Sequence, residues 1–374
     1  MADRSKRPGS TATRFALLAA AVIAAGVLVA CGDDDDSGES GTEGEGGKIA
    51  LLLPETKTTR YEEQDRPNFE RRVGEICPDC EVLYSNANND PAAQQQQAEA
   101  AITDGAEVIV ISAVDVVSAA TIVERAEQAD VDVIAYGRLI PDANISYYVS
   151  IDPFEVGQQQ AEVLMDELEK QGTKDPRIVM INGAPTDSNS KPYKDGAVDV
   201  FDQRGASIEV SYDTPDWSPD EAQREMEQAI TNLGADGFDG TYVANDGMAG
   251  GAIAAMKGAN IDPAERPVTG QDAELAGVQR ILDGEQLMTV YQPITDIAES
   301  AAELAVPLAQ GEEPAADLAP DEVDNGAEMV PSVLLETIAI TDQNVDVLID
   351  DGFLDQADIC SGEYAQACQD AGLG

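Results

Sequence analysis

The fold class is clearest in the stretch of residues 106–137, AEVIVISAVDVVSAATIVERAEQADVDVIAYG. Its two ends, 106–113 and 131–137, are short runs of apolar and β-branched residues, and a helical segment over 117–129 separates them. Runs that are apolar almost throughout are typical of strands buried on both faces of a parallel sheet. The stretch therefore predicts two parallel strands joined by a helix.

The same alternation of strands and helices continues on both sides of this stretch. The other expected strands are KIALLL (48–53), EVLYSNA (81–87), ISYYVSI (145–151), RIVMING (177–183), SIEVSYD (207–213), GTYVAND (240–246), PVTGQDA (267–273) and LMTVYQP (287–293). The other expected helices are 91–103, 154–171, 219–233 and 295–309. Because about 325 residues of this pattern exceed one usual hydrophobic core, we predict two similar α/β lobes that divide near residue 152.

The N-terminus has the features of a lipoprotein export signal. Residues 1–14 carry four basic side chains, and an apolar run follows that ends at Ala30. This run is shorter than the roughly 20 residues of a membrane span, which favours a secretory signal over an anchor. It leads into LVACG, a lipobox pattern in which the cysteine, Cys31, is lipidated. We expect residues 1–30 to be a lipoprotein signal peptide, residues 31–47 an acidic flexible tether, and the protein to be extracytoplasmic. A plain signal peptide or a membrane anchor that contains a cysteine is the alternative.

The charge of the chain excludes one class of partner. With 72 acidic and 22 basic residues, the formal net charge is −50. Nucleic acid is excluded as a partner because its binding depends on neutralising phosphates with Lys and Arg. An anionic membrane surface is equally disfavoured, so contact with the membrane is expected through the lipid alone. We interpret the acidity as a solvated surface rather than as a site for a cationic ligand.

Motifs for catalysis are missing from the sequence. The chain has no His, which removes Ser-His-Asp and Cys-His catalysis and His-ligated zinc. The sequence contains neither a G-x-x-x-x-G-K-[ST] loop nor G-x-S-x-G. The glycine-rich segment GTEGEGG (41–47) precedes a strand, whereas the dinucleotide fingerprint follows one. We therefore expect a binding protein with no enzymatic activity, no metal and no cofactor.

Besides the cysteine of the lipobox, the chain has four cysteines. They are Cys77, Cys80, Cys360 and Cys368. An even number outside the cytoplasm predicts disulfides, and of three possible connectivities we favour the two local pairs, Cys77–Cys80 and Cys360–Cys368. C-P-D-C also has the spacing of a thioredoxin-like redox pair. Such a pair opens a helix after a strand, whereas here the motif closes a helical stretch and precedes a strand, so we predict a structural role.

Polar and aromatic side chains follow the expected strands at their carboxyl ends, where open α/β sheets bind ligands. They are Arg60, Tyr61, Arg138, Asp187, Asn189, Trp217, Asn245, Asp246, Gln271 and Asp272. Each alone suits an ordinary turn or a core position. Together they suit a sugar, because hydroxyl groups donate and accept at once and pair with Asp, Asn and Arg, while sugar rings lie on aromatic faces such as Tyr61 and Trp217.

Four segments carry a resemblance to a known family. They are PTDSNSK (185–191), ANDGMAGGAIAAM (244–256), TGQDAELAGVQRI (269–281) and MTVYQPIT (288–295). Over residues 48–353 the chain resembles the type I periplasmic sugar-binding proteins of ABC importers, and among them the D-xylose binders. The resemblance implies that the ligand contacts fall on Arg60, Tyr61, Arg138, Asp187, Asn189, Trp217, Asn245 and Asp272.

The resemblance also implies an architecture and partners. It implies two Rossmann-like lobes joined by a three-strand hinge, with strands that cross near Ile151, Tyr291 and Val333. We expect an N-terminal lobe of residues 48–151 plus 293–328 and a C-terminal lobe of residues 152–292 plus 329–374. It implies a monomer that closes on a sugar and docks on an ABC permease, which a cytoplasmic ATPase drives. The alternative roles are a sensory lipoprotein that reports sugar to a membrane receptor and, more remotely, a sugar-acting enzyme.

Two positions of the expected site depart from the pattern of the xylose binders. Gly137 stands where they have Asp, and Gln292 stands where they have Lys. The loss of one carboxylate and one ammonium keeps the net charge of the pocket but changes its hydrogen bonds. We therefore expect Arg138 to lack a compensating carboxylate, and the ligand to be a sugar other than plain D-xylose, larger or differently substituted.

Overall fold

The structure, a computed structural model, describes residues 46–373. The predicted signal peptide, the lipidation at Cys31 and nearly all of the predicted tether lie outside these residues. Among the described residues, the longest helices are too short or too polar to cross a membrane.

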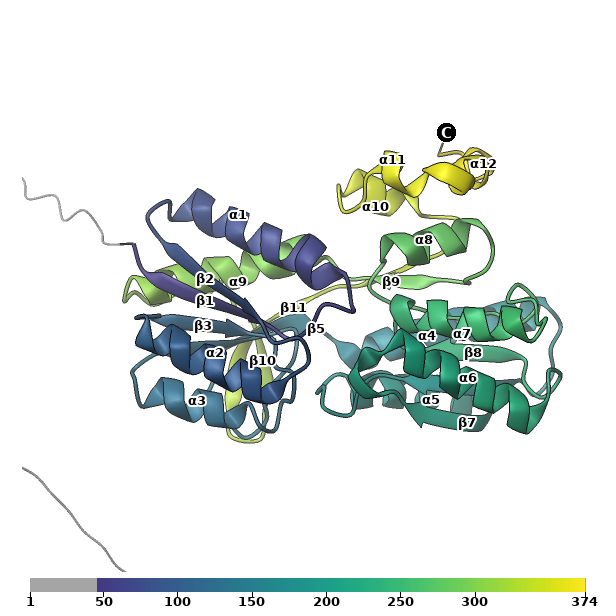
Figure 1. The fold of residues 1–374 in the computed structure, drawn as a ribbon, viewed down its shortest axis with the longest axis horizontal. Coiled ribbons are helices and arrows are strands. Elements are labelled where there is room, and N and C mark those ends of the chain that lie inside the picture. The colour runs from purple at the N-terminus through teal and green to yellow at the C-terminus, as the bar shows by residue number, and fades with distance from the viewer. Residues whose placement is uncertain (1–45, 374) are drawn as a thin grey trace, which may run out of the picture. The chain divides into compact units, whose positions relative to one another are not determined.

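The N-terminal lobe is built on a seven-stranded sheet with the order β10-β11-β5-β4-β3-β1-β2 (Figure 1). All neighbours pair in parallel except β10, which is antiparallel to β11. The strands are β1 (Lys48–Leu53), β2 (Glu81–Asn86), β3 (Val108–Ile111), β4 (Asp132–Tyr136), β5 (Tyr147–Ile151), β10 (Asp321–Asp324) and β11 (Met329–Leu335). The prediction of a parallel sheet is confirmed, and β1 has the predicted bounds.

Helices cover both faces of this sheet. They are α1 (Arg66–Ile76) and α9 (Ile294–Ala309) on one face and α2 (Pro91–Thr103) and α3 (Ala120–Glu127) on the other (Figure 1). Because successive strand residues point to opposite faces, Leu51 and Leu53 join the core under α1 and α9, while Ala50 and Leu52 join the core under α2 and α3. This is why the strand is apolar throughout rather than at alternate positions.

The C-terminal lobe has a smaller parallel sheet with the order β7-β6-β8. Its strands are β6 (Arg177–Asn182), β7 (Ser207–Asp213) and β8 (Gly240–Val243). Its helices are α4 (Pro153–Lys170), α5 (Ser190–Arg204), α6 (Pro219–Leu233), α7 (Asp246–Gly258) and α8 (Leu275–Leu282). Both lobes are therefore helix-covered parallel sheets, as the sequence predicts.

The predicted strand over 267–273 is wrong. Only a single bridge between Thr241 and Val268 forms there. Pro267 has no N–H to donate, and Asp272 and Ala273 adopt positive φ angles of 89° and 49°, which a strand residue does not adopt. The segment is instead an irregular loop at the edge of the C-terminal sheet.

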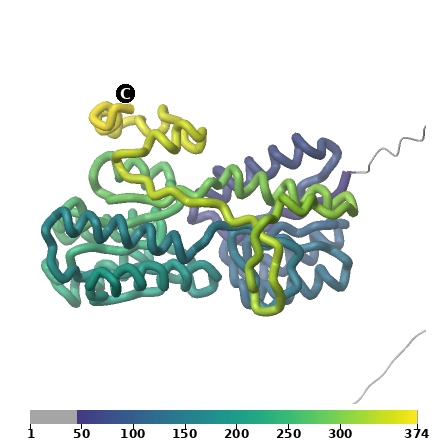
Figure 2. The backbone as a smooth tube through the Cα atoms, turned by 180° about the vertical axis from the view of Figure 1, so that it is seen from behind, coloured from purple at the N-terminus to yellow at the C-terminus, as the bar shows by residue number. Residues whose placement is uncertain are grey.

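The chain passes between the lobes three times (Figure 2). The crossings lie between β5 and α4, between β9 (Thr289–Tyr291) and α9, and between β11 and β12 (Ile338–Ile340), which pairs with β9. The sequence placed residues 329–335 in the C-terminal lobe. The structure corrects this, because β11 is hydrogen-bonded to β5 in the N-terminal sheet.

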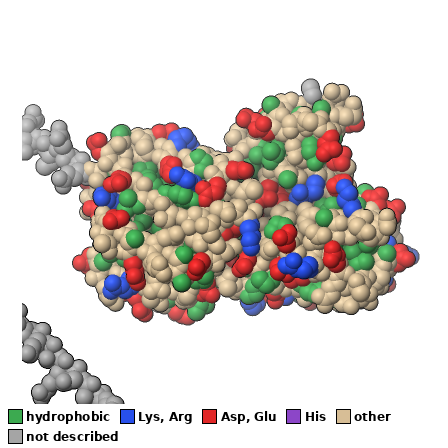
Figure 3. Space-filling view, viewed as in Figure 1, with side chains coloured by type: hydrophobic (Ala, Val, Ile, Leu, Met, Phe, Trp, Pro, Cys, Tyr) green, Lys and Arg blue, Asp and Glu red, His purple; other side chains and the backbone are tan. Residues whose placement is uncertain are grey.

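Both local disulfides are present. Cys77 pairs with Cys80 in the turn between α1 and β2, and Cys360 pairs with Cys368, with Cα–Cα distances of 5.3 and 5.6 Å. The second disulfide lies in a C-terminal segment that contains α10 (Asp346–Asp350), α11 (Gln356–Ile359), η3 (Gly362–Tyr364) and α12 (Ala365–Asp370). Acidic side chains, with basic ones among them, are spread over the face of the molecule seen in Figure 3 and do not gather in one patch.

Candidate ligand-binding site

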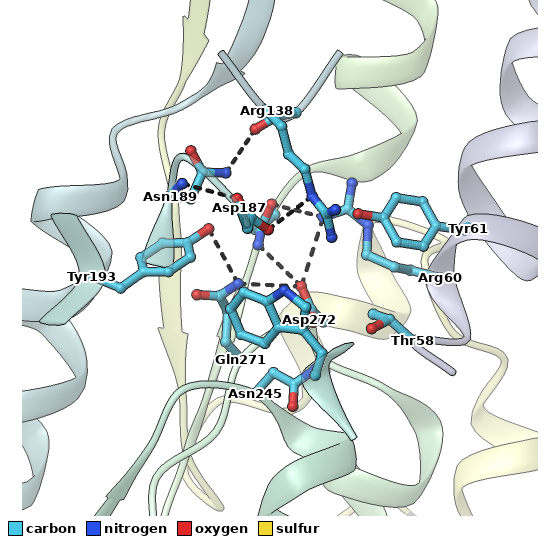
Figure 4. A pocket seen from close by; sticks show the side chains of 13 residues that line it. Thr58, Arg60, Tyr61, Arg138, Asp187, Asn189, Tyr193, Asn245, Gln271 and Asp272 are labelled. Atoms are coloured by element: carbon cyan, nitrogen blue, oxygen red, sulfur yellow. Dashed lines mark hydrogen bonds and ion pairs between the residues drawn. The ribbon is translucent and has the colours of Figure 1, made fainter. Parts of the chain in front are cut away.

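A pocket lies between the two lobes, at the carboxyl ends of both sheets (Figure 4). The side chains and backbone that line it come from Thr58, Arg60, Tyr61, Gly137, Arg138, Asp187, Asn189, Tyr193, Trp217, Asn245, Gln271, Asp272 and Gln292. The structure thus brings into one pocket the eight residues that the resemblance implied as ligand contacts, together with the two departing positions, Gly137 and Gln292. Asp246, also noted at a strand end, does not line it.

Arg60 is fixed from within the N-terminal lobe. It lies just before the π-helical turn η1 (Tyr61–Asp65), which follows β1. Its Nε and Nη2 donate to the two carboxylate oxygens of Asp65 at 3.0 and 2.8 Å, and the Tyr136 hydroxyl also donates to Asp65. A bidentate pair of this kind holds the planar guanidinium in one orientation. Arg60 is therefore positioned before any ligand arrives.

Arg138 is fixed across the lobe boundary. Its Nε lies 2.8 Å from the Asp187 carboxylate of the C-terminal lobe, and its Nη1 donates to the Ala113 carbonyl at 2.8 Å. Burial lowers the pKa of this guanidinium, but the negative charge of Asp187 raises it, and the net pKa lies above the ordinary value. The expectation that Arg138 lacks a compensating carboxylate is wrong, because Asp187 fills that role.

The loop that precedes α5 brings polar groups of the C-terminal lobe to the pocket. The backbone N–H of Asn189 donates to the Asp187 carboxylate at 2.9 Å, a turn that holds both side chains at the start of the helix. The Asn189 amide then donates to the Gly137 carbonyl of the other lobe at 2.7 Å. In the next loop, Asn245 caps α7 by accepting from the Met248 N–H at 3.0 Å.

Asp272 and Gln292 form the third polar group of the pocket. The Gln292 amide donates to Asp272 at 3.1 Å, and its carbonyl oxygen accepts from Nη1 of Arg60 at 2.9 Å. Nη1 of Arg60 also lies 3.6 Å from the Asp272 carboxylate. Burial raises the pKa of Asp272, and the nearby Arg60 opposes that shift. Gln292 therefore connects the cation of one lobe to the anion of the other.

Aromatic rings form the less polar part of the wall. Trp217 lies in the short turn η2 (Pro215–Trp217), where it adopts a φ angle of 52°. Its ring packs so closely on Gly183 that a Cβ there would lie 2.1 Å from a ring carbon. Tyr193 meets Trp217 edge to face, with ring centroids 6.4 Å apart. The chain thus holds an indole ring in the pocket at the cost of an unusual backbone conformation.

Three polar atoms of the wall are buried and form no hydrogen bond among residues 46–373. They are the indole N–H of Trp217, the side-chain oxygen of Gln271 and Nε of Arg138, which is in an ion pair with Asp187. Buried polar groups in folded proteins nearly always have a hydrogen-bond partner. One donor and one acceptor therefore remain for a ligand in this pocket.

Two residues of the wall were not predicted from the sequence, and a third was not predicted as a ligand contact. Thr58 precedes Arg60 by two residues, and no sequence signal marks it. Tyr193 lies four residues after Asn189 on α5, so helical periodicity could have identified it. Gln271 was noted beside Asp272 but was not among the expected ligand contacts; its amide lies 3.4 Å from the Tyr193 hydroxyl.

Two buried carboxyl groups lie behind the pocket. Glu274 accepts from the Thr59 N–H of the other lobe at 3.0 Å, and burial raises its pKa to about 8. Asp246 accepts from the Glu274 N–H at 2.9 Å, and burial raises its pKa to about 7. Within the described part of the chain, His, Cys, Asp and Glu side chains form no cluster suited to a metal ion.

Comparison with known proteins places this pocket in a family context. A family model described as a periplasmic binding protein domain matches residues 49–313. The D-xylose-binding periplasmic protein of Escherichia coli K12 is 34% identical, over 83% of this chain and 92% of its own length. The multiple sugar-binding periplasmic receptor ChvE of Rhizobium radiobacter is 28% identical, over 82% of this chain and 90% of its own length.

A solved structure shows the same fold. The ABC transporter solute-binding protein of Clostridium phytofermentans, crystallised with β-D-glucose, superposes with a TM-score of 0.74 and 28% identity. The match covers 83% of this chain and 99% of that protein. The similarity therefore includes both lobes and the pocket between them.

Proposed function

The chain belongs to the type I periplasmic binding proteins, and on this premise we propose that it captures a monosaccharide between its lobes and delivers it to an ABC importer. The lobes separate and approach by hinge motion at the three crossings, and a ligand that contacts both walls stabilises the joined form. The protein binds its ligand without transforming it.

One observation carries the choice of a neutral, polyhydroxylated ligand. Each buried cation of the pocket already has a carboxylate partner: Arg60 has Asp65, and Arg138 has Asp187. An anionic ligand would need a cation without a carboxylate partner. The remaining carboxylate, Asp272, lies 3.6 Å from Arg60 and accepts from the Gln292 amide, so it does not stand alone for a cationic ligand. Sugar hydroxyls need closely spaced donors and acceptors, and an aromatic face for the ring, and both are present. The names of the relatives support the same choice.

The proposal includes a location outside the cytoplasm and a membrane permease as the partner. A lipid on Cys31 holds the protein outside the cytoplasm, and the sugar-loaded monomer docks on a membrane permease that a cytoplasmic ATPase drives. The sequence pattern before Cys31 and the description of the Clostridium phytofermentans protein as an ABC transporter component support this. Replacing Cys31 by Ser should leave the protein soluble or unprocessed. Continued partitioning of this variant with membranes would refute the lipid anchor.

Calorimetric titration against a panel of neutral sugars tests the binding function. The panel contains D-xylose, D-glucose, D-ribose and myo-inositol, with D-glucuronate as an anionic comparison. We expect one-to-one binding of a neutral monosaccharide and no measurable turnover of it during prolonged incubation. Binding of the anion alone, or of none of the neutral sugars, would contradict the proposal.

A further inference from the structure

Gly137 contributes backbone but no side chain to the pocket. It follows β4 with a φ angle of 71°, a conformation that favours glycine. Its N–H donates to the Val149 carbonyl at 2.8 Å, and its carbonyl accepts from Ser150 Oγ at 3.0 Å and from the Asn189 amide at 2.7 Å. These bonds hold the peptide in place, so the gap beside it is a fixed feature of the wall.

The space beside Gly137 is open. A Cβ added there would have only one atom within 4 Å, Ser112 Oγ at 3.9 Å. The contrast is Gly183, on the other wall, where the ring of Trp217 fills the corresponding space. The absence of a side chain therefore leaves a recess at Gly137, whereas at Gly183 it makes room for an aromatic ring.

Ser112 supplies a polar end to this recess. It follows β3 directly, at the carboxyl edge of the sheet, and it is fully buried. Its N–H donates to the Leu52 carbonyl at 3.0 Å, and its carbonyl accepts from the Gln94 amide at 2.8 Å. Its hydroxyl, however, has no hydrogen-bond partner in the part of the chain that the structure describes. A buried hydroxyl without a partner is unfavourable, so a group that supplies one is favoured here.

The chemistry of the recess suits one short, hydroxyl-bearing substituent. A serine hydroxyl donates and accepts, as a primary alcohol does. The hydroxymethyl group on C5 is the part of a hexopyranose that the matching pentopyranose lacks: D-glucose and D-xylose differ only by this group. Building on the proposed function, we propose that the Gly137–Ser112 recess receives the hydroxymethyl group of a hexopyranose, and that Ser112 makes this protein prefer hexoses to pentoses.

Three sugars separate the parts of this proposal by calorimetry on the unmodified protein. D-Glucose has the carbon and the hydroxyl of the substituent, 6-deoxy-D-glucose has only the carbon, and D-xylose has neither. We expect D-glucose to bind most tightly. Ser112→Ala should weaken D-glucose binding by roughly three- to tenfold, the effect of one hydrogen bond, and leave 6-deoxy-D-glucose and D-xylose unchanged. Ser118→Ala, at an exposed serine of the following loop, is the matched control and should change none of the three affinities.

A second variant tests the recess by filling it. Gly137→Ala should weaken the binding of both six-carbon sugars more than the binding of D-xylose, provided that its melting curve shows a folded protein. Ser112→Ala keeps the proposal testable if it does not. Equal affinities for D-glucose and D-xylose, with Ser112→Ala changing neither, would overturn this inference and leave the proposed function intact. An equal loss for D-glucose and 6-deoxy-D-glucose in Ser112→Ala would overturn the role of the hydroxyl. Failure to bind any of the neutral monosaccharides would instead overturn the proposed function itself.

Discussion

The two walls of the pocket are built from different chemistry. The N-terminal wall presents two guanidinium groups, Arg60 and Arg138, beside the bare peptide of Gly137. The C-terminal wall presents two carboxylates, Asp187 and Asp272, together with amides and the aromatic rings of Trp217 and Tyr193. The N-terminal wall therefore mainly donates hydrogen bonds. The C-terminal wall mainly accepts them and also offers aromatic rings on which a sugar ring can pack.

The two walls also differ in how they are held. Arg60 has its carboxylate partner, Asp65, in its own lobe, whereas the carboxylate partner of Arg138 is Asp187 of the other lobe. Arg60 is therefore preorganised when the lobes are apart, and Arg138 reaches its final environment only when they meet. In the proposed hinge motion, closure completes part of the binding site, so ligand affinity should be coupled to contact between the lobes.

The largest effect should come from removing the charge of the acceptor wall. Asp272→Asn keeps the shape of the side chain but removes the carboxylate that faces Arg60 and Gln292. A charge-assisted hydrogen bond contributes roughly 1.5–3 kcal/mol, so sugar affinity should fall by about tenfold to a hundredfold. Calorimetry measures this loss. Asp283→Asn, at an exposed aspartate, is the control and should bind normally; an unchanged affinity in Asp272→Asn would mean that this wall does not accept from the ligand.

The next effect is a dependence of sugar affinity on pH. It arises because the titratable carboxyl group of Glu274 accepts a hydrogen bond from Thr59 of the other lobe. Its pKa is raised to about 8 where the two lobes meet. Burial is the main cause and the negative charges of Asp246 and Asp272 add to it, while the hydrogen bond from the Thr59 N–H and the charge of Arg280 oppose it. When the lobes separate, the exposed carboxyl group should return toward an ordinary pKa of about 4.3. At a pH between these two pKa values, the joined form therefore binds one proton more than the separated form.

The sign of the pH effect follows from this proton. Raising the pH from about 5 to 8 favours the separated lobes, so sugar affinity should fall over this range and become constant above it. Asp246 is held by contacts within its own lobe, so its pKa should change little on closure and contribute little. Glu274→Gln still offers an oxygen to Thr59 but cannot ionise, and its affinity should not depend on pH. A wild-type affinity that rises with pH would contradict this account.

A smaller effect is expected from exchanging the two positions that depart from the xylose binders. Gly137→Asp together with Gln292→Lys should strengthen D-xylose binding by about fivefold, roughly the contribution of one net hydrogen bond. Two features of the structure limit this increase in D-xylose affinity. The backbone φ angle of 71° at Gly137 disfavours a side chain, and the Gln292 carbonyl oxygen, which accepts from Arg60, would be lost. Gln292→Lys alone should therefore weaken D-xylose binding. Calorimetry on the single and double variants tests this, and no gain in the double variant would show that these positions do not set specificity.

The smallest effect on binding should come from the disulfides, which lie outside both walls. Closing such short loops stabilises the fold by an estimated 2–3 kcal/mol each, so replacing Cys360 and Cys368 by Ala should lower the melting temperature. Sugar affinity, measured below that temperature, should stay within experimental error. Loss of binding in a folded variant would mean that the C-terminal segment takes part in the site.

The sequence was informative where local patterns act alone. The apolar runs predicted most of the strands, since a strand buried on both faces has no polar positions. Of the ten residues expected at the strand ends, nine line the pocket, and Asp246 lies behind it. It failed at 267–273, where positive φ angles at Asp272 and Ala273 follow from tertiary packing, and at residues 329–335, whose partner strand β5 is distant in sequence. It also missed Asp187 as the partner of Arg138, because a contact between lobes leaves no trace in local spacing.

The central claim is that a sugar holds the two walls together. Small-angle X-ray scattering of the purified protein, with and without a saturating neutral monosaccharide found by calorimetry, tests this directly. We expect the sugar to reduce the radius of gyration of the wild-type protein. At the same sugar concentration, the radius of gyration of Asp272→Asn should fall by less. A sugar that binds stoichiometrically while the scattering curve stays the same would contradict the central claim.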